Sequence, residues 1–189
     1  MPFTNNGKIV YTKFYEIWDK LCNILILDVN LIKKIEEFKT IVNKYNISGL
    51  NITIPYKESI INQLDYVDPV AKEIGAVNTI KFHNNILSGY NTDYLGFYTS
   101  IKNIVNSNTK ALILGSGGAS KAIAYTLKIL NIKYLFVSRS KKNKNYINYN
   151  EISKEIINKH NLIINCTPVG TYPEIDQIPK IPISLISNR

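Results

Sequence analysis

Hydrophobic residues follow two patterns that alternate along this chain: short apolar runs, and longer stretches with three- and four-residue spacing. Short apolar runs are typical of buried β-strands, and the spaced stretches are typical of helices with one apolar face. The predicted strands are Asn23–Leu27, Gly49–Ile54, Thr79–Phe82, Ile86–Tyr90, Ala111–Leu114, Ile132–Val137 and Leu162–Ile164. The predicted helices are Lys13–Leu21, Leu31–Asn43, Tyr56–Asp65, residues 119–130 and Glu151–Lys159. This alternation favours an α/β fold with parallel strands.

Two of these segments predict side-chain positions as well. The helix over Leu31–Asn43 should bury one face, formed by Leu31, Ile35, Phe38 and Val42. The two strands around residues 83–85 should form a hairpin, because His83, Asn84 and Asn85 interrupt the apolar pattern.

The pattern changes near residue 110, and we predict two domains. Before it the helices and strands are mixed, whereas after it the order is strand, helix, strand, helix, strand. That order is half of a doubly wound, Rossmann-like nucleotide-binding sheet. We therefore predict an N-terminal α/β substrate domain over residues 1–106 and a dinucleotide-binding domain over residues 107–189.

The net charge of +9 raises the question of nucleic-acid binding. Only Arg139 and Arg189 are arginine, and the lysines are spread along the whole chain, whereas nucleic-acid readers concentrate basic and aromatic residues in patches. The 24 Asn and 32 Ile residues indicate a compositional bias that also enriches lysine. We expect small anionic partners and no nucleic acid.

The sequence predicts a cytoplasmic protein without a membrane anchor. No apolar run approaches the roughly 20 residues of a transmembrane helix, and the N-terminus has no apolar signal region. Cys22 and Cys166 are too few for a disulfide framework.

A glycine-rich loop is the strongest chemical signal. Gly115, Ser116, Gly117, Gly118 and Ala119 follow a buried strand and precede a helix. Glycines allow backbone amides to approach a pyrophosphate at the positive end of the helix dipole. We predict a dinucleotide site at this glycine loop; the alternative is a tight turn without a ligand.

The end of the next strand indicates which dinucleotide binds. NAD sites carry an acidic residue there, which binds the ribose 2′-hydroxyl. This chain has Ser138, Arg139 and Ser140, which suit a 2′-phosphate. The turn predicts NADP, with a solvated basic loop as the alternative.

Lys57 lies in the segment Gly49–Lys57. If Pro55 begins a helix, Lys57 lies in its first turn, where the helix dipole disfavours an ammonium. That placement suggests a proton carrier, although a solvated surface lysine fits equally well. Asp93 could be a helix N-cap and Asn78 a turn residue.

Taken together, these segments resemble the shikimate dehydrogenase family. The resemblance rests on six motifs in order: the Asn51–Lys57 segment, Gly75–Thr79, Asn91–Asp93, the glycine loop, Ser138–Ser140 and Asn165–Gly170. It covers about residues 24–175 and implies NADP-dependent interconversion of 3-dehydroshikimate and shikimate in aromatic amino-acid (chorismate) biosynthesis.

The resemblance also implies a role for individual residues. Lys57 and Asp93 match the catalytic pair, and Thr53 and Asn78 match residues that bind the substrate. The cofactor would contact the glycine loop, the Ser138–Ser140 turn and the segment that contains Asn165, Cys166 and Thr167. No metal is implied.

The chain departs from the family pattern at both ends. The family's N-terminal Ser-x-Ser motif is replaced near Thr4, Asn5 and Asn6, and we expect a C-terminal truncation because the sequence stops at Arg189. Asn143 and Thr171 stand where the family usually has a base and a methionine. The alternatives are therefore a non-catalytic remnant that at most binds dinucleotide, or a quinate/shikimate dehydrogenase that uses NAD.

Overall fold

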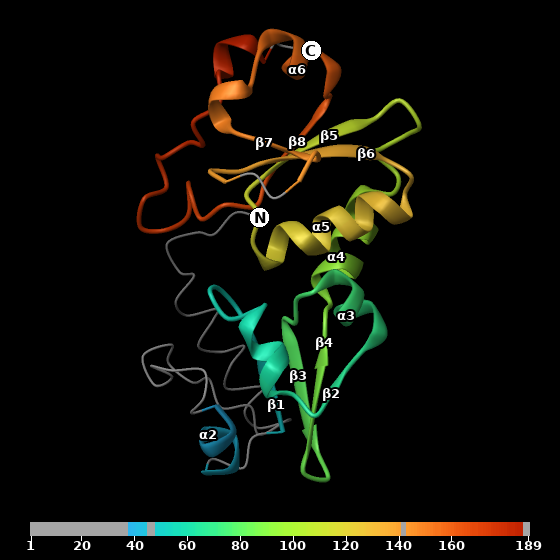
Figure 1. Ribbon diagram of the computed structural model, residues 1–189, viewed down its shortest axis with the longest axis vertical. Coiled ribbons are helices and arrows are strands. Elements are labelled where there is room, and N and C mark those ends of the chain that lie inside the picture. The colour runs from blue at the N-terminus through green and yellow to red at the C-terminus, as the bar shows by residue number, and fades with distance from the viewer. Residues whose placement is uncertain (1–37, 45–47, 141–142, 187–189) are drawn as a thin grey trace. The chain divides into compact units, whose positions relative to one another are not determined.

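The computed structural model describes residues 38–44, 48–140 and 143–186 (Figure 1). The chain forms two compact units, Met1–Asn91 and Thr92–Arg189. The predicted helix Lys13–Leu21 and strand Asn23–Leu27 lie outside the described residues. The domain boundary at residue 106 stays a prediction.

The first unit contains a four-stranded mixed sheet in the order β1-β3-β4-β2 (Figure 1). Its strands are β1 (Gly49–Asn51), β2 (Tyr66–Val67), β3 (Thr79–His83) and β4 (Ile86–Tyr90). β3 pairs antiparallel with both β1 and β4, and β2 pairs parallel with β4. The predicted hairpin is confirmed: His83 pairs with Ile86, and Asn84 and Asn85 have φ of 49° and 61°. Asparagine tolerates this left-handed conformation better than most residues.

Among the described residues of this unit, three short helices accompany the sheet: α2 (Phe38–Lys44), the 3₁₀ helix η3 (Ser59–Gln63) and α3 (Pro69–Ile74). α3 begins where the Asp68 carboxylate accepts hydrogen bonds from the backbone amides of Val70 and Ala71, at 2.9 and 3.3 Å. It ends at Gly75, whose φ of 71° suits glycine. This helix was not predicted, although its Asp-Pro start and glycine end are recognisable signals.

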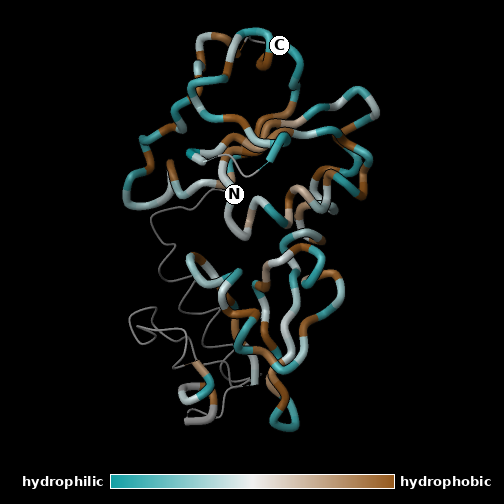
Figure 2. The backbone as a smooth tube through the Cα atoms, viewed as in Figure 1, coloured by the Kyte–Doolittle hydropathy of each residue, from teal (hydrophilic) through white to brown (hydrophobic). Residues whose placement is uncertain are grey.

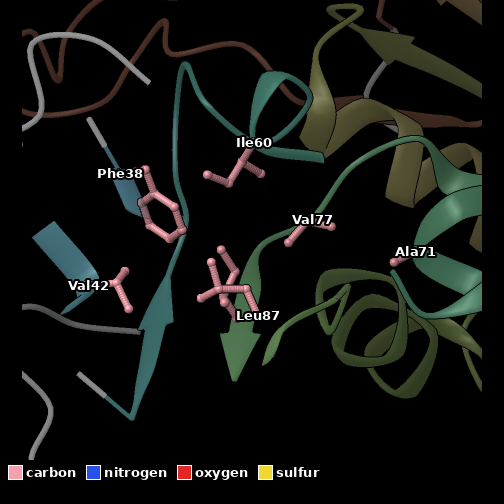
Figure 3. Packing of buried hydrophobic residues seen from close by; sticks show 7 residues of the cluster. Phe38, Val42, Ile60, Ala71, Val77 and Leu87 are labelled. Carbon is pink, nitrogen blue, oxygen red and sulfur yellow. The ribbon is translucent and has the colours of Figure 1, made fainter. Parts of the chain in front are cut away.

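Buried side chains from these helices and strands form the core of the first unit (Figure 3). Phe38 and Val42 of α2 are fully buried, which confirms that part of the predicted apolar helical face. Leu31 and Ile35 lie outside the described residues. The core consists of Phe38, Val42, Ile60, Ala71, Val77, Ile80 and Leu87.

The predictions for residues 49–65 need two corrections. β1 ends at Asn51 and not at Ile54. No α-helix begins at Pro55, which follows a cis peptide bond; residues 54–58 form turns, and only η3 follows. Both ends of the segment are hydrogen-bonded elsewhere: the Val77 amide donates to the Lys57 carbonyl at 2.7 Å, and the Asp65 amide donates to the Leu87 carbonyl at 3.0 Å. These tertiary bonds replace the predicted helix.

The second unit contains a fully parallel sheet in the order β7-β6-β5-β8. Its strands are β5 (Lys110–Leu114), β6 (Lys133–Val137), β7 (Tyr146–Ile147) and β8 (Leu162–Asn165). In chain order the strands are third, second, first and fourth across the sheet, as in half of a dinucleotide-binding fold. The predicted α/β fold with a Rossmann-like sheet is confirmed; β7 was not predicted.

Helices cover both faces of this sheet (Figure 1). α4 (Asp93–Ile101) and α5 (Gly118–Ile129) lie on one face, and α6 (Lys154–Lys159) lies on the other. Because successive strand residues point to opposite faces, Ala111 and Ile113 join the core beneath α5, whereas Leu112 and Leu114 join the core beneath α6. β5 is therefore apolar on both faces, and the hydrophobic colour is concentrated along the central strands (Figure 2).

The last predicted helix begins later than expected. Residues Tyr149–Glu151 form the 3₁₀ helix η4, and α6 starts after Ser153, whose hydroxyl accepts a hydrogen bond from the Ile156 amide at 3.3 Å. A final 3₁₀ turn, η5, spans Ile183–Leu185. Among the described residues, no helix has the length and apolar character needed to cross a bilayer.

Candidate functional site

Three predicted cofactor segments meet at one edge of the second unit's sheet. Because β5, β6 and β8 are parallel, the glycine loop, residues 138–140 and residues 165–167 all follow carboxyl ends of strands. The Gly115 amide donates to the Val137 carbonyl at 2.8 Å, and the Cys166 amide donates to the Leu114 carbonyl at 2.9 Å. The parallel pairing therefore brings together segments that are far apart in sequence.

Gly115 is required by the close approach of the β5 and β8 ends. Its φ is +106°, and a Cβ there would lie 3.2 Å from both the Cys166 carbonyl oxygen and the Thr167 Cγ2 atom. A side chain at this position would strain the backbone and separate the two segments.

The glycine loop leads directly into α5. Gly117 is the N-cap residue, and a Cβ built on it would meet no atom within 4 Å, so space is open beside the loop. Gly118 and Ala119 begin the helix, where backbone amides and the helix dipole favour an anion. Ser120 replaces the usual third glycine; it is fully buried, and its hydroxyl donates to the Gly117 carbonyl at 2.6 Å.

The turn after β6 contains one buried and two exposed candidate side chains. Ser138 is only 6% exposed, and its hydroxyl donates to the Ser116 hydroxyl at 3.0 Å. It also accepts a hydrogen bond from the Ser140 amide at 3.4 Å. Arg139 and Ser140 are exposed and follow a strand end without an acidic residue. Ser138 therefore holds the two loops together, while Arg139 and Ser140 face solvent.

Tyr149 adds a residue that the sequence analysis did not single out. Burial raises the pKa of its hydroxyl, and the positive charge of Arg139 partly opposes that rise. The effect places Arg139 within electrostatic reach of Tyr149. The sequence pattern did not reveal the position of Tyr149, because η4 is brought to this edge of the sheet by β7, and a strand of two residues has no apolar periodicity.

The segment after β8 turns sharply through the side chain of Asn165. Its Oδ1 atom accepts hydrogen bonds from the Thr167 amide at 3.0 Å and the Thr167 hydroxyl at 2.6 Å. Its Nδ2 atom donates to the Val169 carbonyl at 3.0 Å. Asparagine commonly makes such side-chain turns.

Cys166 lies within this turn and packs against the core beneath α5. Burial raises the pKa of its thiol to about 12. The thiol is therefore protonated near pH 7.

The candidate substrate residues of the first unit surround the segment that precedes β3. The Ile52 amide donates to the Asn78 carbonyl at 2.7 Å, and the Asn78 amide donates to the Tyr90 carbonyl at 3.0 Å. The buried Asn91 side chain donates to the Ala76 carbonyl at 2.9 Å. Three motifs that are separate in sequence are thus joined by hydrogen bonds.

Thr53, Lys57 and Asn78 occupy this hydrogen-bonded region. Thr53 is exposed, and Lys57 and Asn78 are half-buried. The Asn78 Oδ1 atom accepts a hydrogen bond from the Thr79 hydroxyl at 3.0 Å. The predicted position of Lys57 in the first turn of a helix is wrong, because Lys57 lies in a turn before Glu58, the N-cap of η3. The helix dipole therefore cannot be the cause of any special chemistry at Lys57.

Asp93 is the first residue of α4 in the second unit. The N-cap is Thr92, whose side chain makes no capping hydrogen bond, so the N-cap alternative for Asp93 is wrong. A carboxylate in the first helical turn is favoured by the helix dipole. Within the described part of the chain, no group of three His, Cys, Asp or Glu residues could hold a metal ion.

Known proteins match both units. The family model described as the shikimate dehydrogenase substrate binding domain matches residues 10–80. The shikimate dehydrogenase (NADP(+)) of Methanosphaera stadtmanae is 40% identical over 190 residues, which cover 90% of this chain and 67% of the relative. This chain belongs to the shikimate dehydrogenase family.

Two further shikimate dehydrogenases agree with this assignment. The enzyme of Clostridium beijerinckii, also named shikimate dehydrogenase (NADP(+)), is 44% identical over 161 residues, which cover 79% of this chain and 57% of the relative. The crystal structure of shikimate dehydrogenase 1 from Peptoclostridium difficile matches this chain with a TM-score of 0.72 and 34% sequence identity. The match covers 91% of this chain and 66% of the chain in that crystal structure. The chain spans 57–67% of the length of the two curated relatives. The predicted family is confirmed, and the activity of the chain is a separate proposal.

Proposed function

We propose that this shikimate dehydrogenase homologue is an NADP-dependent oxidoreductase that interconverts 3-dehydroshikimate and shikimate. The observation that carries the proposal is the meeting of the glycine loop, the Arg139 turn and the Asn165–Thr167 turn at one edge of a 3-2-1-4 parallel sheet. Both curated relatives described above carry NADP(+) in their names, which supports the same cofactor here.

The second unit has the features that an NADP site needs. The first-turn amides of α5 would bind the pyrophosphate, and the open space beside Gly117 leaves room for it. Arg139 and Ser140 would bind the 2′-phosphate through charge-assisted and hydroxyl hydrogen bonds. Asn165, Cys166 and Thr167 would line the neighbouring strand end. When bound, NADPH supplies the hydride that reduces the ring carbonyl of 3-dehydroshikimate.

The chain's own residues would bind the substrate and move the proton. Thr53 and Asn78 would hold the substrate through hydrogen bonds. Lys57 would donate a proton to the carbonyl oxygen as it becomes a hydroxyl, and would take the proton back in the reverse direction. Asp93 would orient the reacting hydroxyl as the other member of the catalytic pair. We place the reaction in the cytoplasm, in aromatic amino-acid (chorismate) biosynthesis.

The test is NADPH-dependent reduction of 3-dehydroshikimate, followed at the absorbance of NADPH. Lys57→Ala should lower kcat by about 10²–10⁴-fold, the usual contribution of a positioned acid or base. NADPH affinity should be nearly unchanged, because the proposed cofactor residues belong to the other unit. Lys81→Ala, an exposed lysine on β3, is the matched control and should keep full activity. Nearly full kcat in Lys57→Ala at saturating substrate would refute the proposed proton transfer.

The second catalytic residue is tested with the first. Asp93→Asn should lower kcat by a comparable factor, and the double variant should lose much less than the product of the two losses, because residues that act as a unit are non-additive. NADPH binding without any turnover in the parent chain would instead indicate a non-catalytic dinucleotide-binding protein. Preferential turnover of quinate with NAD would indicate a quinate/shikimate dehydrogenase.

A further inference from the structure

Thr126 on α5 has a hydroxyl that contacts two helices. The residue is fully buried, and its Oγ1 atom lies 3.1 Å from the Ala122 carbonyl oxygen, one turn earlier in α5. The same atom lies 3.0 Å from the Tyr94 carbonyl oxygen on α4. One hydroxyl proton is thus shared between a carbonyl of its own helix and a carbonyl of the neighbouring helix.

Only the first of these two bonds is ordinary for a helical threonine. Threonine side chains in helices often donate to the carbonyl four residues earlier. Thr99 on α4 does this, donating to the Leu95 carbonyl at 2.9 Å, and it is exposed. Thr126 differs from Thr99 in its burial and in its second acceptor.

The second acceptor lies in the first turn of α4. Tyr94 follows Asp93, the first residue of that helix, and the Tyr94 and Tyr125 rings form an edge-to-face pair with centroids 5.3 Å apart. The N-cap Thr92 makes no side-chain capping bond. Adjacent residues Tyr125 and Thr126 of α5 therefore contact the helical turn that contains Asp93.

We propose that Thr126 is a positioning residue that holds Asp93 in register with α5, the helix that begins at the glycine loop. This inference rests on the proposed function, in which Asp93 acts on the substrate and the N-terminus of α5 binds the cofactor. The hydroxyl fixes the Tyr94 carbonyl, and the Asp93 carboxylate extends from the adjacent residue. Small displacements of a catalytic group lower the rate more than they lower binding.

The decisive variant is Thr126→Val, which keeps the branched shape and removes the hydroxyl. It should lower kcat by about 10- to 100-fold, the scale expected for a catalytic group displaced by about 1 Å. The KM for 3-dehydroshikimate and the affinity for NADPH should change little. Thr126→Ser should recover most of the rate, and Thr99→Val, which removes only an exposed bond to its own helix, should keep full activity.

A purely structural role of Thr126 can be distinguished from a positioning role by combining Thr126→Val with Asp93→Asn. If Thr126 acts through Asp93, adding Thr126→Val to Asp93→Asn should cost less than about twofold in further rate, because the two changes remove one function. A combined loss equal to the product of the single losses would overturn the proposal. So would a Thr126→Val protein that keeps parental kcat and only melts at a lower temperature.

A second measurement does not depend on enzymatic activity. It tests the role of Thr126 even if the parent chain shows no turnover, a result that would count against the proposed function alone. The Gly96 amide donates to the Thr92 carbonyl at 3.1 Å in the first turn of α4, and the Lys102 amide donates to the Tyr98 carbonyl at 3.0 Å at the other end. Thr126→Val should make hydrogen exchange several-fold faster at Gly96 and leave it unchanged at Lys102. Unchanged exchange at Gly96 would show that Thr126 does not hold this turn.

Discussion

The Ser138 hydroxyl donates a hydrogen bond to the Ser116 hydroxyl, with 3.0 Å between the two oxygen atoms. Ser116 belongs to the glycine loop after β5, and Ser138 begins the turn after β6. One bond between buried and half-buried groups thus connects the segment proposed to bind the pyrophosphate with the segment proposed to bind the 2′-phosphate.

Removal of this bond should weaken NADPH binding. A neutral hydrogen bond contributes about 0.5–1.5 kcal/mol, so Ser138→Ala should raise the Kd of NADPH by roughly 2- to 13-fold. Calorimetric titration measures the change. Ser100→Ala, which removes an exposed hydroxyl from α4, is the control and should bind NADPH as the parent does. An unchanged Kd in Ser138→Ala would mean that the bond does not organise the loops for binding.

Arg139 should determine the preference for NADPH over NADH. A charge-assisted contact contributes about 1.5–3 kcal/mol, so Arg139→Ala should weaken NADPH binding by roughly 10- to 150-fold. NADH lacks the 2′-phosphate, and its affinity should stay the same. The exposed Lys144→Ala variant is the control for a general loss of positive charge in this unit. Equal losses for both cofactors would rule out recognition of the 2′-phosphate by Arg139.

A side chain at Gly89 should destabilise the protein. A Cβ at this buried position on β4 would lie 2.3 Å from the Leu64 Cδ1 atom and 3.0 Å from the Val77 Cγ2 atom. The leucine tip can shift, but the branched valine cannot, so Gly89→Ala should lower the free energy of unfolding by about 1–3 kcal/mol.

Gly96 on α4 provides the opposite case for the same substitution. A Cβ at Gly96 would meet no atom within 4 Å, so Gly96→Ala should stabilise the protein by up to about 1 kcal/mol through helix propensity. Urea denaturation of both variants measures the two effects. Equal stability of the two variants would contradict the packing found around Gly89.

Cys166 should resist alkylation until the protein unfolds. Burial raises the pKa of its thiol to about 12, whereas an unfolded cysteine has a pKa of about 8.5. In a Cys22→Ser background, iodoacetamide at pH 9 should modify the folded protein far more slowly than the urea-unfolded protein. Equal rates would show that the thiol is accessible.

The same shift makes stability depend on pH. Because the folded protein disfavours the thiolate, this stabilisation is complete below the unfolded pKa and is lost as the pH rises from about 8.5 toward 12. Cys166→Ala should reduce the fall in the free energy of unfolding over that range, measured by urea titration at successive pH values.

The cofactor side of the fold could be predicted because local pattern and tertiary packing agree there. Residues 111–114 of β5 form one apolar run. Glycine is needed at position 115 for two reasons: the positive φ, and the close approach of the Cys166 backbone. The hairpin at Asn84 and Asn85 was also predictable, because the residues themselves favour the turn conformation that the strands require.

The substrate side was harder because tertiary bonds override the local pattern. The apolar spacing of Tyr56–Asp65 indicated a helix, yet its two ends are hydrogen-bonded to Val77 and Leu87. Strands of two residues, such as β2 and β7, have no periodicity of their own and are defined by their partners. Thr126 and Tyr149 were missed for a related reason, since their significance lies in contacts with residues remote in sequence.

The two-sided burial of β5 bears on how this sequence tolerates mutation. Lysine and asparagine are abundant along the chain, but residues 111–120 contain neither, although Lys110 and Lys121 flank them directly. In this stretch every strand side chain is enclosed by one helical layer or the other, and the residues that follow lead into the first turn of α5, the proposed pyrophosphate site. A one-residue deletion would exchange the two faces of the strand and shift the loop by about 3.3 Å. The enclosure of residues 111–114 also explains why neither lysine nor asparagine occurs among them, because an ammonium or an amide would be costly to bury between two apolar layers.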